Sequence, residues 1–175
     1  MGRRKIYHAR LMYARPFIDS LDFAINGREI SGEVQFSEMP RLLDILENPQ
    51  GSLRYTIQGG TDSQGTNFLA ISLDGQCSLR CQRCLNKMGY PLRLDTRLFL
   101  RDQTSLDALG DDDEEFDSIL ADMQLSVLDL LEEEILLSLP IAPKHEFSAC
   151  QAAVDENAHG QEKKPFAALA KMKRN

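Results

Sequence analysis

The sequence predicts an α+β domain in which an antiparallel sheet, or a partial barrel, is packed by a helix from the C-terminal half of the chain. Two observations support this: apolar and polar residues alternate through the middle of the chain, and an apolar segment near residue 130 ends at a proline. The 175 residues suffice for one domain with a buried core. We expect a basic N-terminal arm at 1–15, a single domain at 16–150, and a mobile tail at 151–175.

The predicted sheet extends from about residue 20 to residue 101. Short apolar alternations at 21–36 and 53–57 precede a long one at 69–81, in which every odd position is apolar or small. The last predicted strand, 91–101, has apolar residues at even positions and three arginines at odd positions. A register slip by one residue would bury these arginines, so we expect the register to be firm.

Two helices are expected inside the domain. Ser37 is a suitable N-cap for a helix that continues to residue 46, and Ser126 is a suitable N-cap for a longer helix at 127–139. The longer helix is apolar around most of its circumference, which is typical of a buried helix. We expect its three glutamates at 132–134 to form a solvated or partner-facing stripe. The residues expected to pack on the odd face of strand 69–81 are Leu128, Leu131 and Ile135.

The charged residues are unevenly distributed. Twenty Lys and Arg against 27 Asp and Glu give a net charge of −7, which argues against a protein coated in nucleic acid. Basic residues gather at 1–15, at 80–101 and in the tail, whereas acidic residues gather in an expected flexible loop at about 103–117. Separate blocks of charge suggest separate binding surfaces, although ordinary solvated faces would give the same pattern.

Several classes of protein are disfavoured by what the sequence lacks. It contains no apolar run long enough for a membrane-spanning helix and no secretory signal, so we expect a cytoplasmic protein with no membrane partner. It also contains no Gly-rich phosphate loop, no Gly-x-Ser-x-Gly elbow and no His-Glu-x-x-His motif. We therefore expect a protein that is not an enzyme and has no small-molecule substrate or catalytic residue.

A possible metal site is the strongest local motif. Cys81-Gln-Arg-Cys84 lies at the end of a predicted strand, and His145 and Cys150 follow the long helix. Three thiolates and one imidazole are ligands that suit tetrahedral Zn²⁺, the one cofactor that these residues suggest. The alternative is that Cys81 belongs to the core, Cys84 to a turn and His145 to the surface. A redox pair is disfavoured, because no helix begins at the two cysteines.

Two further surfaces are candidates for binding. Arginines and an aromatic residue on one sheet face suit single-stranded or irregular RNA, although long arginine side chains also solubilise an exposed face. The residues of this candidate RNA surface are Arg80, Arg83, Arg93, Arg97, Phe99 and Arg101. The tail combines a polar linker with a short basic amphipathic helix, which could bind a partner or cap the core. The residues of this candidate partner-binding tail are Phe166, Leu169, Lys171, Lys173 and Arg174.

Three motifs in order give the sequence a family resemblance. They are Cys81-Gln-Arg-Cys-Leu85, the segment from Asp129 to His145, and Lys164-Pro-Phe-Ala-Ala-Leu-Ala-Lys-Met-Lys173. Over nearly its whole length the chain resembles the bacterial YceD family, the large ribosomal RNA subunit accumulation proteins. This resemblance implies a non-enzymatic factor for the synthesis, processing or stability of 23S ribosomal RNA.

The resemblance also implies partners. They would be large-subunit ribosomal RNA or precursor ribosomal particles, together with ribosomal or assembly proteins. The alternative function is a zinc-stabilised adaptor that binds a protein without direct RNA contact. The salt dependence of RNA binding would separate the two, because phosphate contacts weaken steeply with salt.

Overall fold

The structure is a computed structural model, and it describes residues 6–8, 16–108, 117–146 and 150. Most of the predicted basic arm, the centre of the acidic loop and the whole tail at 151–175 lie outside the described residues. The candidate partner-binding residues Phe166, Leu169, Lys171, Lys173 and Arg174 therefore lie outside the described residues.

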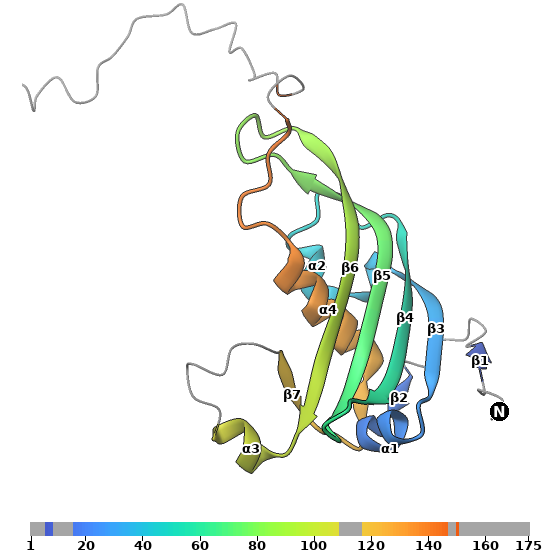
Figure 1. Cartoon of the computed structure of the whole chain (residues 1–175). Helices are drawn as coiled ribbons and strands as arrows, with labels where there is room; N and C mark the ends of the chain where they lie inside the picture. Colours follow the sequence, from blue (N-terminus) through green and yellow to red (C-terminus); the bar gives the residue numbers. More distant parts are fainter. Residues whose placement is uncertain (1–5, 9–15, 109–116, 147–149, 151–175) are drawn as a thin grey trace, which may run out of the picture.

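The main sheet has six strands and is open rather than closed into a barrel (Figure 1). Its spatial order is β1 (Ile6–His8), β3 (Glu29–Gln35), β4 (Ser52–Thr61), β5 (Asn67–Arg80), β6 (Lys87–Arg101) and β7 (Ser118–Leu120). The four central strands pair antiparallel, while the short outer strands pair parallel to their neighbours. A second, two-stranded sheet joins β2 (Phe17–Ile18) to β8 (Leu125–Ser126). The predicted α+β class is confirmed, and of its two forms the structure has the open sheet.

The register of β5 and β6 agrees with the pattern of the sequence. Leu69 lies opposite Leu98, and Leu73 lies opposite Leu94, so odd residues of β5 and even residues of β6 share one face. That face contributes most of the buried apolar residues of both strands. The arginines of β6 accordingly lie on the opposite face.

Helices α1 (Ser20–Ile25), α2 (Pro40–Leu43) and α4 (Val127–Ser138), together with the 3₁₀ turn η1 (Phe36–Glu38), contribute buried residues that cover the apolar face of the sheet. Helix α3 (Gln103–Asp107) follows β6, has no buried residue and contacts β7 instead. Figure 1 shows α2 and α4 together on one side of the sheet. The core joins Leu128, Leu131 and Ile135 of α4 to the odd residues of β5, as predicted.

Two expectations about the first part of the domain are wrong. Residues 20–25 form a helix instead of a strand, because the Asp19 carboxylate caps Asp22 N at 3.0 Å. The helix expected at 37–46 is shortened, since Ser37 lies inside the 3₁₀ turn and Pro40 begins a helix of only four residues.

The acidic regions also differ from expectation. The segment after β6 is not wholly a loop, because the Asp102 side chain accepts a hydrogen bond from Ser105 N–H and so caps α3. In α4, Glu132 and Glu134 are buried rather than solvated, and only Glu133 is largely exposed. The surroundings of Glu132 explain its burial. Its Oε1 accepts hydrogen bonds from the backbone N–H groups of Arg41 and Leu42, at 2.7 and 3.1 Å.

Candidate metal centre

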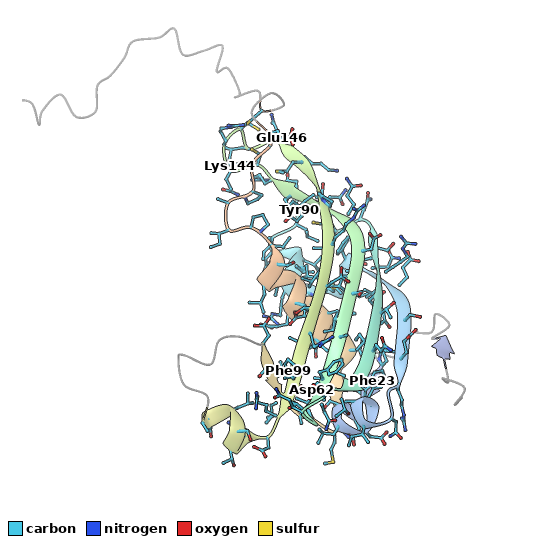
Figure 2. All side chains as sticks on the ribbon, viewed as in Figure 1. Phe23, Asp62, Tyr90, Phe99, Lys144 and Glu146 are labelled. Carbon is cyan, nitrogen blue, oxygen red and sulfur yellow. The ribbon has the colours of Figure 1, made fainter. Side chains whose placement is uncertain are left out.

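The four predicted metal ligands meet at one end of the molecule. Cys81 and Cys84 lie in the turn between β5 and β6, while His145 and Cys150 follow α4. The two segments are joined by the Gln82 N–H, which donates to the Pro143 carbonyl at 2.8 Å. Figure 2 shows Lys144 and Glu146 beside this end of the β5–β6 hairpin, far along the sheet from Phe99. The sequence thus predicted correctly which residues converge.

The spacing of the four ligand atoms fits a tetrahedral ion. All four lie within 4.8 Å of one another; Cys81 Sγ is 3.8 Å from Cys150 Sγ, and Cys84 Sγ is 3.4 Å from His145 Nδ1. A tetrahedron with Zn–S bonds of about 2.3 Å has S···S edges of about 3.8 Å, and a Zn–N bond of about 2.0 Å shortens the S···N edges. None of the cysteines forms a disulfide. The set Cys₃His can therefore hold a metal ion.

The imidazole of His145 is oriented by the backbone of the hairpin. Its Nε2 is 3.3 Å from the carbonyl oxygen of Lys87, so Nε2–H donates there and Nδ1 is left with a lone pair. Nδ1 is the nitrogen that faces Cys84. A carbonyl partner of this kind fixes the tautomer and ring plane of metal-binding histidines.

The backbone of the turn favours thiolates. Burial alone would raise the pKa of the Cys81 thiol, but hydrogen bonds from the backbone N–H groups of Cys84, His145 and Arg83 lower that pKa to about 5. For Cys84, the backbone N–H of Asn86 favours the thiolate, yet burial and the sulfurs of Cys150 and Cys81 together raise the pKa. Three neighbouring sulfurs thus resist full ionisation unless a cation lies between them.

The guanidinium of Arg83 places a positive charge beside the sulfurs. Arg83 Nε donates to Cys150 Sγ at 2.9 Å, and its terminal nitrogen donates to the His145 carbonyl at 3.2 Å. The hydrogen bond to Cys150 raises the pKa of the Arg83 guanidinium. Arg83, predicted as an RNA-binding residue, thus lies against the metal ligands.

The other residues of the candidate RNA surface are not gathered in one place. Arg80 forms a bidentate pair with Glu47 at 2.7 and 3.1 Å, near the hairpin end. Arg93 and Arg101 are eight residues apart on β6, which at about 3.4 Å per residue separates them by about 27 Å. Arg93 pairs with Asp74 at 3.5 Å, and Arg101 Nε donates to Ser118 Oγ at 3.2 Å.

The aromatic part of that candidate surface is packed against the protein itself. Phe99 is only 7% exposed and meets Phe68 edge to face, with ring centroids 6.2 Å apart. The Arg97 guanidinium lies 4.4 Å from the centroid of the Phe68 ring. Stacking of a nucleobase on Phe99 would require this cluster to open.

Sequence reasoning missed the residues that support the metal centre through their backbone. Lys87 and Pro143 act through carbonyl oxygens, and Asn86 acts through both its N–H and its carbonyl. Every residue type has these backbone groups, so residue type cannot predict which residues support the centre. The only available signal for Lys87, Pro143 and Asn86 was their nearness in sequence to the four candidate ligands.

Comparison with known proteins places the chain in a family. The family described as Large ribosomal RNA subunit accumulation protein YceD matches residues 69–173, more than half of the chain. The chain belongs to the YceD family. The matched region of this YceD chain contains all four ligands of the candidate metal centre.

One relative extends the similarity towards the N-terminus. A Haemophilus influenzae protein described as Large ribosomal RNA subunit accumulation protein YceD is 22% identical over 165 residues, covering 89% of this chain and 94% of the relative. No solved structure matches this YceD chain. Within the described residues, no helix is long and apolar enough to cross a membrane.

Proposed function

We propose that this YceD chain is a non-enzymatic factor that supports accumulation of 23S large-subunit ribosomal RNA through its synthesis, processing or stability. It would act in the cytoplasm on that RNA or on precursor ribosomal particles. The observation that carries the proposal is the family match over residues 69–173, since the family is named for large ribosomal RNA subunit accumulation. Ribosomal or assembly proteins are further partners in this proposal.

Zinc has a structural role in the proposed function. With Zn²⁺ held by Cys81, Cys84, His145 and Cys150, all four positions of a tetrahedral ion are protein ligands. A closed site of this type leaves no position for a reacting water, whereas it does hold two chain segments together. Here those segments are the β5–β6 turn and the chain after α4.

Direct RNA contact through the basic residues is part of the proposal. The Arg93 side chain is 81% exposed and is supported by a single long ion pair among the described residues, so its guanidinium can also reach a phosphate. Arg80, Arg97 and Arg101 would contribute beside their protein partners. The tail at 164–174 would add an apolar and cationic segment that binds the particle.

The test is sedimentation of cell extract on a density gradient, combined with measurement of 23S ribosomal RNA in a strain that lacks the protein. We expect the full chain to co-migrate with precursor large subunits and to restore 23S RNA levels. Truncation after Gln161 should leave the melting temperature unchanged and abolish co-migration. Confinement of the full chain to the free-protein fractions would contradict the proposal.

A zinc-stabilised adaptor without RNA contact is the second candidate. It is favoured by the ion pairs that occupy Arg80 and Arg93, since arginines engaged by the protein contribute less to phosphate binding. RNA affinity measured between low and high salt separates the two functions. A steep fall of RNA affinity with rising salt indicates phosphate contacts. Association with ribosomal particles that does not change with salt indicates an apolar protein interface.

A further inference from the structure

The tip of the β5–β6 turn carries an exposed apolar residue in an unfavourable conformation. Leu85 has φ of 60°, and among the described residues it is the only non-glycine with positive φ. Its side chain is 66% exposed. Its backbone N–H donates to the Cys81 carbonyl at 2.9 Å, so the turn holds the residue in this conformation. Glycine would take the position without strain, and strained residues of this kind cluster at binding sites.

Cations surround this tip. We define the hairpin end as residues 80–87 with 143–146; it holds four Lys and Arg against the carboxylate of Glu146. The carboxylate of Glu47 also lies at this end, where Arg80 and the charge of Lys87 lower its pKa. Arg80 and Arg83 are engaged by Glu47 and the metal ligands, but Lys87 and Lys144 are exposed and form no ion pair with a described residue. A basic end on a chain of net charge −7 is suited to a polyanion.

A shallow hollow adjoins the hairpin end through Lys87. Its volume is about 440 Å³, and its lining includes Asn48, Gln50, Gln76 and Ser78. Amide and hydroxyl groups can donate and accept hydrogen bonds, as the edge of a nucleobase requires. The Gln76 amide lies directly over Gly89, where a Cβ would be 2.8 Å from Gln76 Nε2.

We propose that the hairpin end is the surface that binds unpaired RNA. Leu85 packs against an exposed base, Lys87 and Lys144 bind phosphates, and the amide-lined hollow takes the edge of a neighbouring base. A protein partner fits less well, because a single apolar side chain among cations and amides is not the contiguous apolar centre of a protein interface. This inference rests on the proposed function, of which it specifies the ligand and the site.

Leu85→Gly is the decisive variant, since it removes the apolar side chain and also relieves the positive φ. The zinc-loaded full chain is titrated with a labelled single-stranded RNA of about 12 nucleotides and with the duplex of the same sequence. We expect the variant to keep its zinc and its melting temperature while single-strand affinity falls about five- to tenfold, because the variant no longer buries apolar side-chain surface against a base. Met123→Ala, which removes an exposed apolar side chain in the β7–β8 connection, should leave affinity unchanged.

The contributions of Lys87 and Lys144 are tested through the salt dependence of RNA affinity. Lys87→Gln and Lys144→Gln should each reduce the slope of log affinity against log salt by about 0.7. Arg28→Gln, between α1 and β3 and paired with Asp22, should not change the slope. Binding by the wild type that is lowered by Arg93→Gln but not by Leu85→Gly or the two lysine variants would overturn the assigned surface.

Two other results would also overturn the inference. One is equal or stronger binding of the duplex, and the other is a Leu85→Gly variant that loses particle association but retains RNA affinity, which would indicate a protein-docking tip. The proposed function is judged separately, by 23S RNA levels and by co-migration of the wild-type chain. It can therefore stand even where the hairpin end proves not to bind RNA.

Discussion

The buried carboxylate of Glu132 acts as the N-terminal cap of helix α2. It is 2% exposed, and its Oε1 accepts the first backbone N–H groups of α2, a helix that has no capping side chain of its own. The neighbouring residue Glu133 pairs with the side chain of Arg41 at the surface. Two adjacent glutamates of one helix thus hold the same short segment, one from inside the core and one from solvent.

We predict that Glu132→Ala lowers the free energy of unfolding by about 1–3 kcal/mol, because the part-buried Arg41 N–H loses its acceptor and the buried Leu42 N–H is left with the Met39 carbonyl at 3.2 Å. Glu133→Ala is the matched control and should change stability little, since an exposed ion pair contributes little. Urea denaturation of both variants measures the difference. Equal effects would show that the buried hydrogen bonds are not what holds α2 against α4.

Glu134 makes stability depend on pH. Burial raises its pKa above the ordinary value of 4.5, and the charges of Asp117 and Glu133 raise it further. The folded state therefore keeps a proton that the unfolded state loses, and stability falls as pH rises from about 4.5 through the raised pKa.

Glu134→Gln should accordingly raise the melting temperature at pH 7 by a few degrees and have little effect at pH 4. Melting curves over this pH range provide the measurement. A benefit that is the same at both pH values would mean that ionisation of Glu134 is not its cause.

Residue type predicted which residues form the candidate metal centre but not the groups around them. Cysteine and histidine at 81, 84, 145 and 150 are recognisable because few other roles suit them in this arrangement. The hydrogen-bond donors to Glu132, in contrast, are backbone N–H groups 90 and 91 residues away. No local pattern distinguishes a glutamate that finds such partners from one on a solvated face.

At the scale of elements, long periodic segments were predictable and short ones were not. The β5 and β6 strands extend over 14 and 15 residues, so their alternation determines which face is buried. Helices α1 and α2 have six and four residues, too few to display a helical period. Their existence depends on a capping carboxylate, on Pro40 and on packing against the sheet, which only the tertiary structure reveals.

Helix α4 depends on packing in the core that it shares with the odd residues of β5 and the even residues of β6. Leu131 is 1% exposed within this core, so Leu131→Ala should lower the free energy of unfolding by about 2–5 kcal/mol. Leu137→Ala, at a position 74% exposed on the same helix, should have little effect. Chemical denaturation of the pair measures the contrast. Similar losses in both variants would contradict the packing of α4 described here.

At the scale of the whole molecule, the four residues of the candidate metal centre come from parts of the chain that are far apart. Cys81 and Cys150 are separated by 69 residues, and constraining a loop of this length by a cross-link stabilises a fold by about 4 kcal/mol. Removal of zinc by a chelator should thus lower the melting temperature by on the order of 10 °C.

Cysteine variants identify the source of this effect. Cys84→Ser should lose stoichiometric zinc in elemental analysis and become insensitive to the chelator. Cys77→Ala is the control, since Cys77 is buried in the core outside the ligand set and its loss should leave zinc binding intact. A wild-type protein without stoichiometric zinc, or chelator sensitivity retained by Cys84→Ser, would refute the metal centre.

The separation of the ligands has a consequence while the protein is being synthesised. Cys84 leaves the translating ribosome 61 residues before His145, a delay of about 3–12 s at ordinary rates of elongation. During that interval the sheet from β3 to β6 can form, but its two turn cysteines have no further ligands. The ligand set is complete, and a bound metal can shield the two turn cysteines, only once residue 150 has emerged. Alkylation of stalled nascent chains should therefore modify both cysteines at shorter lengths and spare them once the last ligand has emerged.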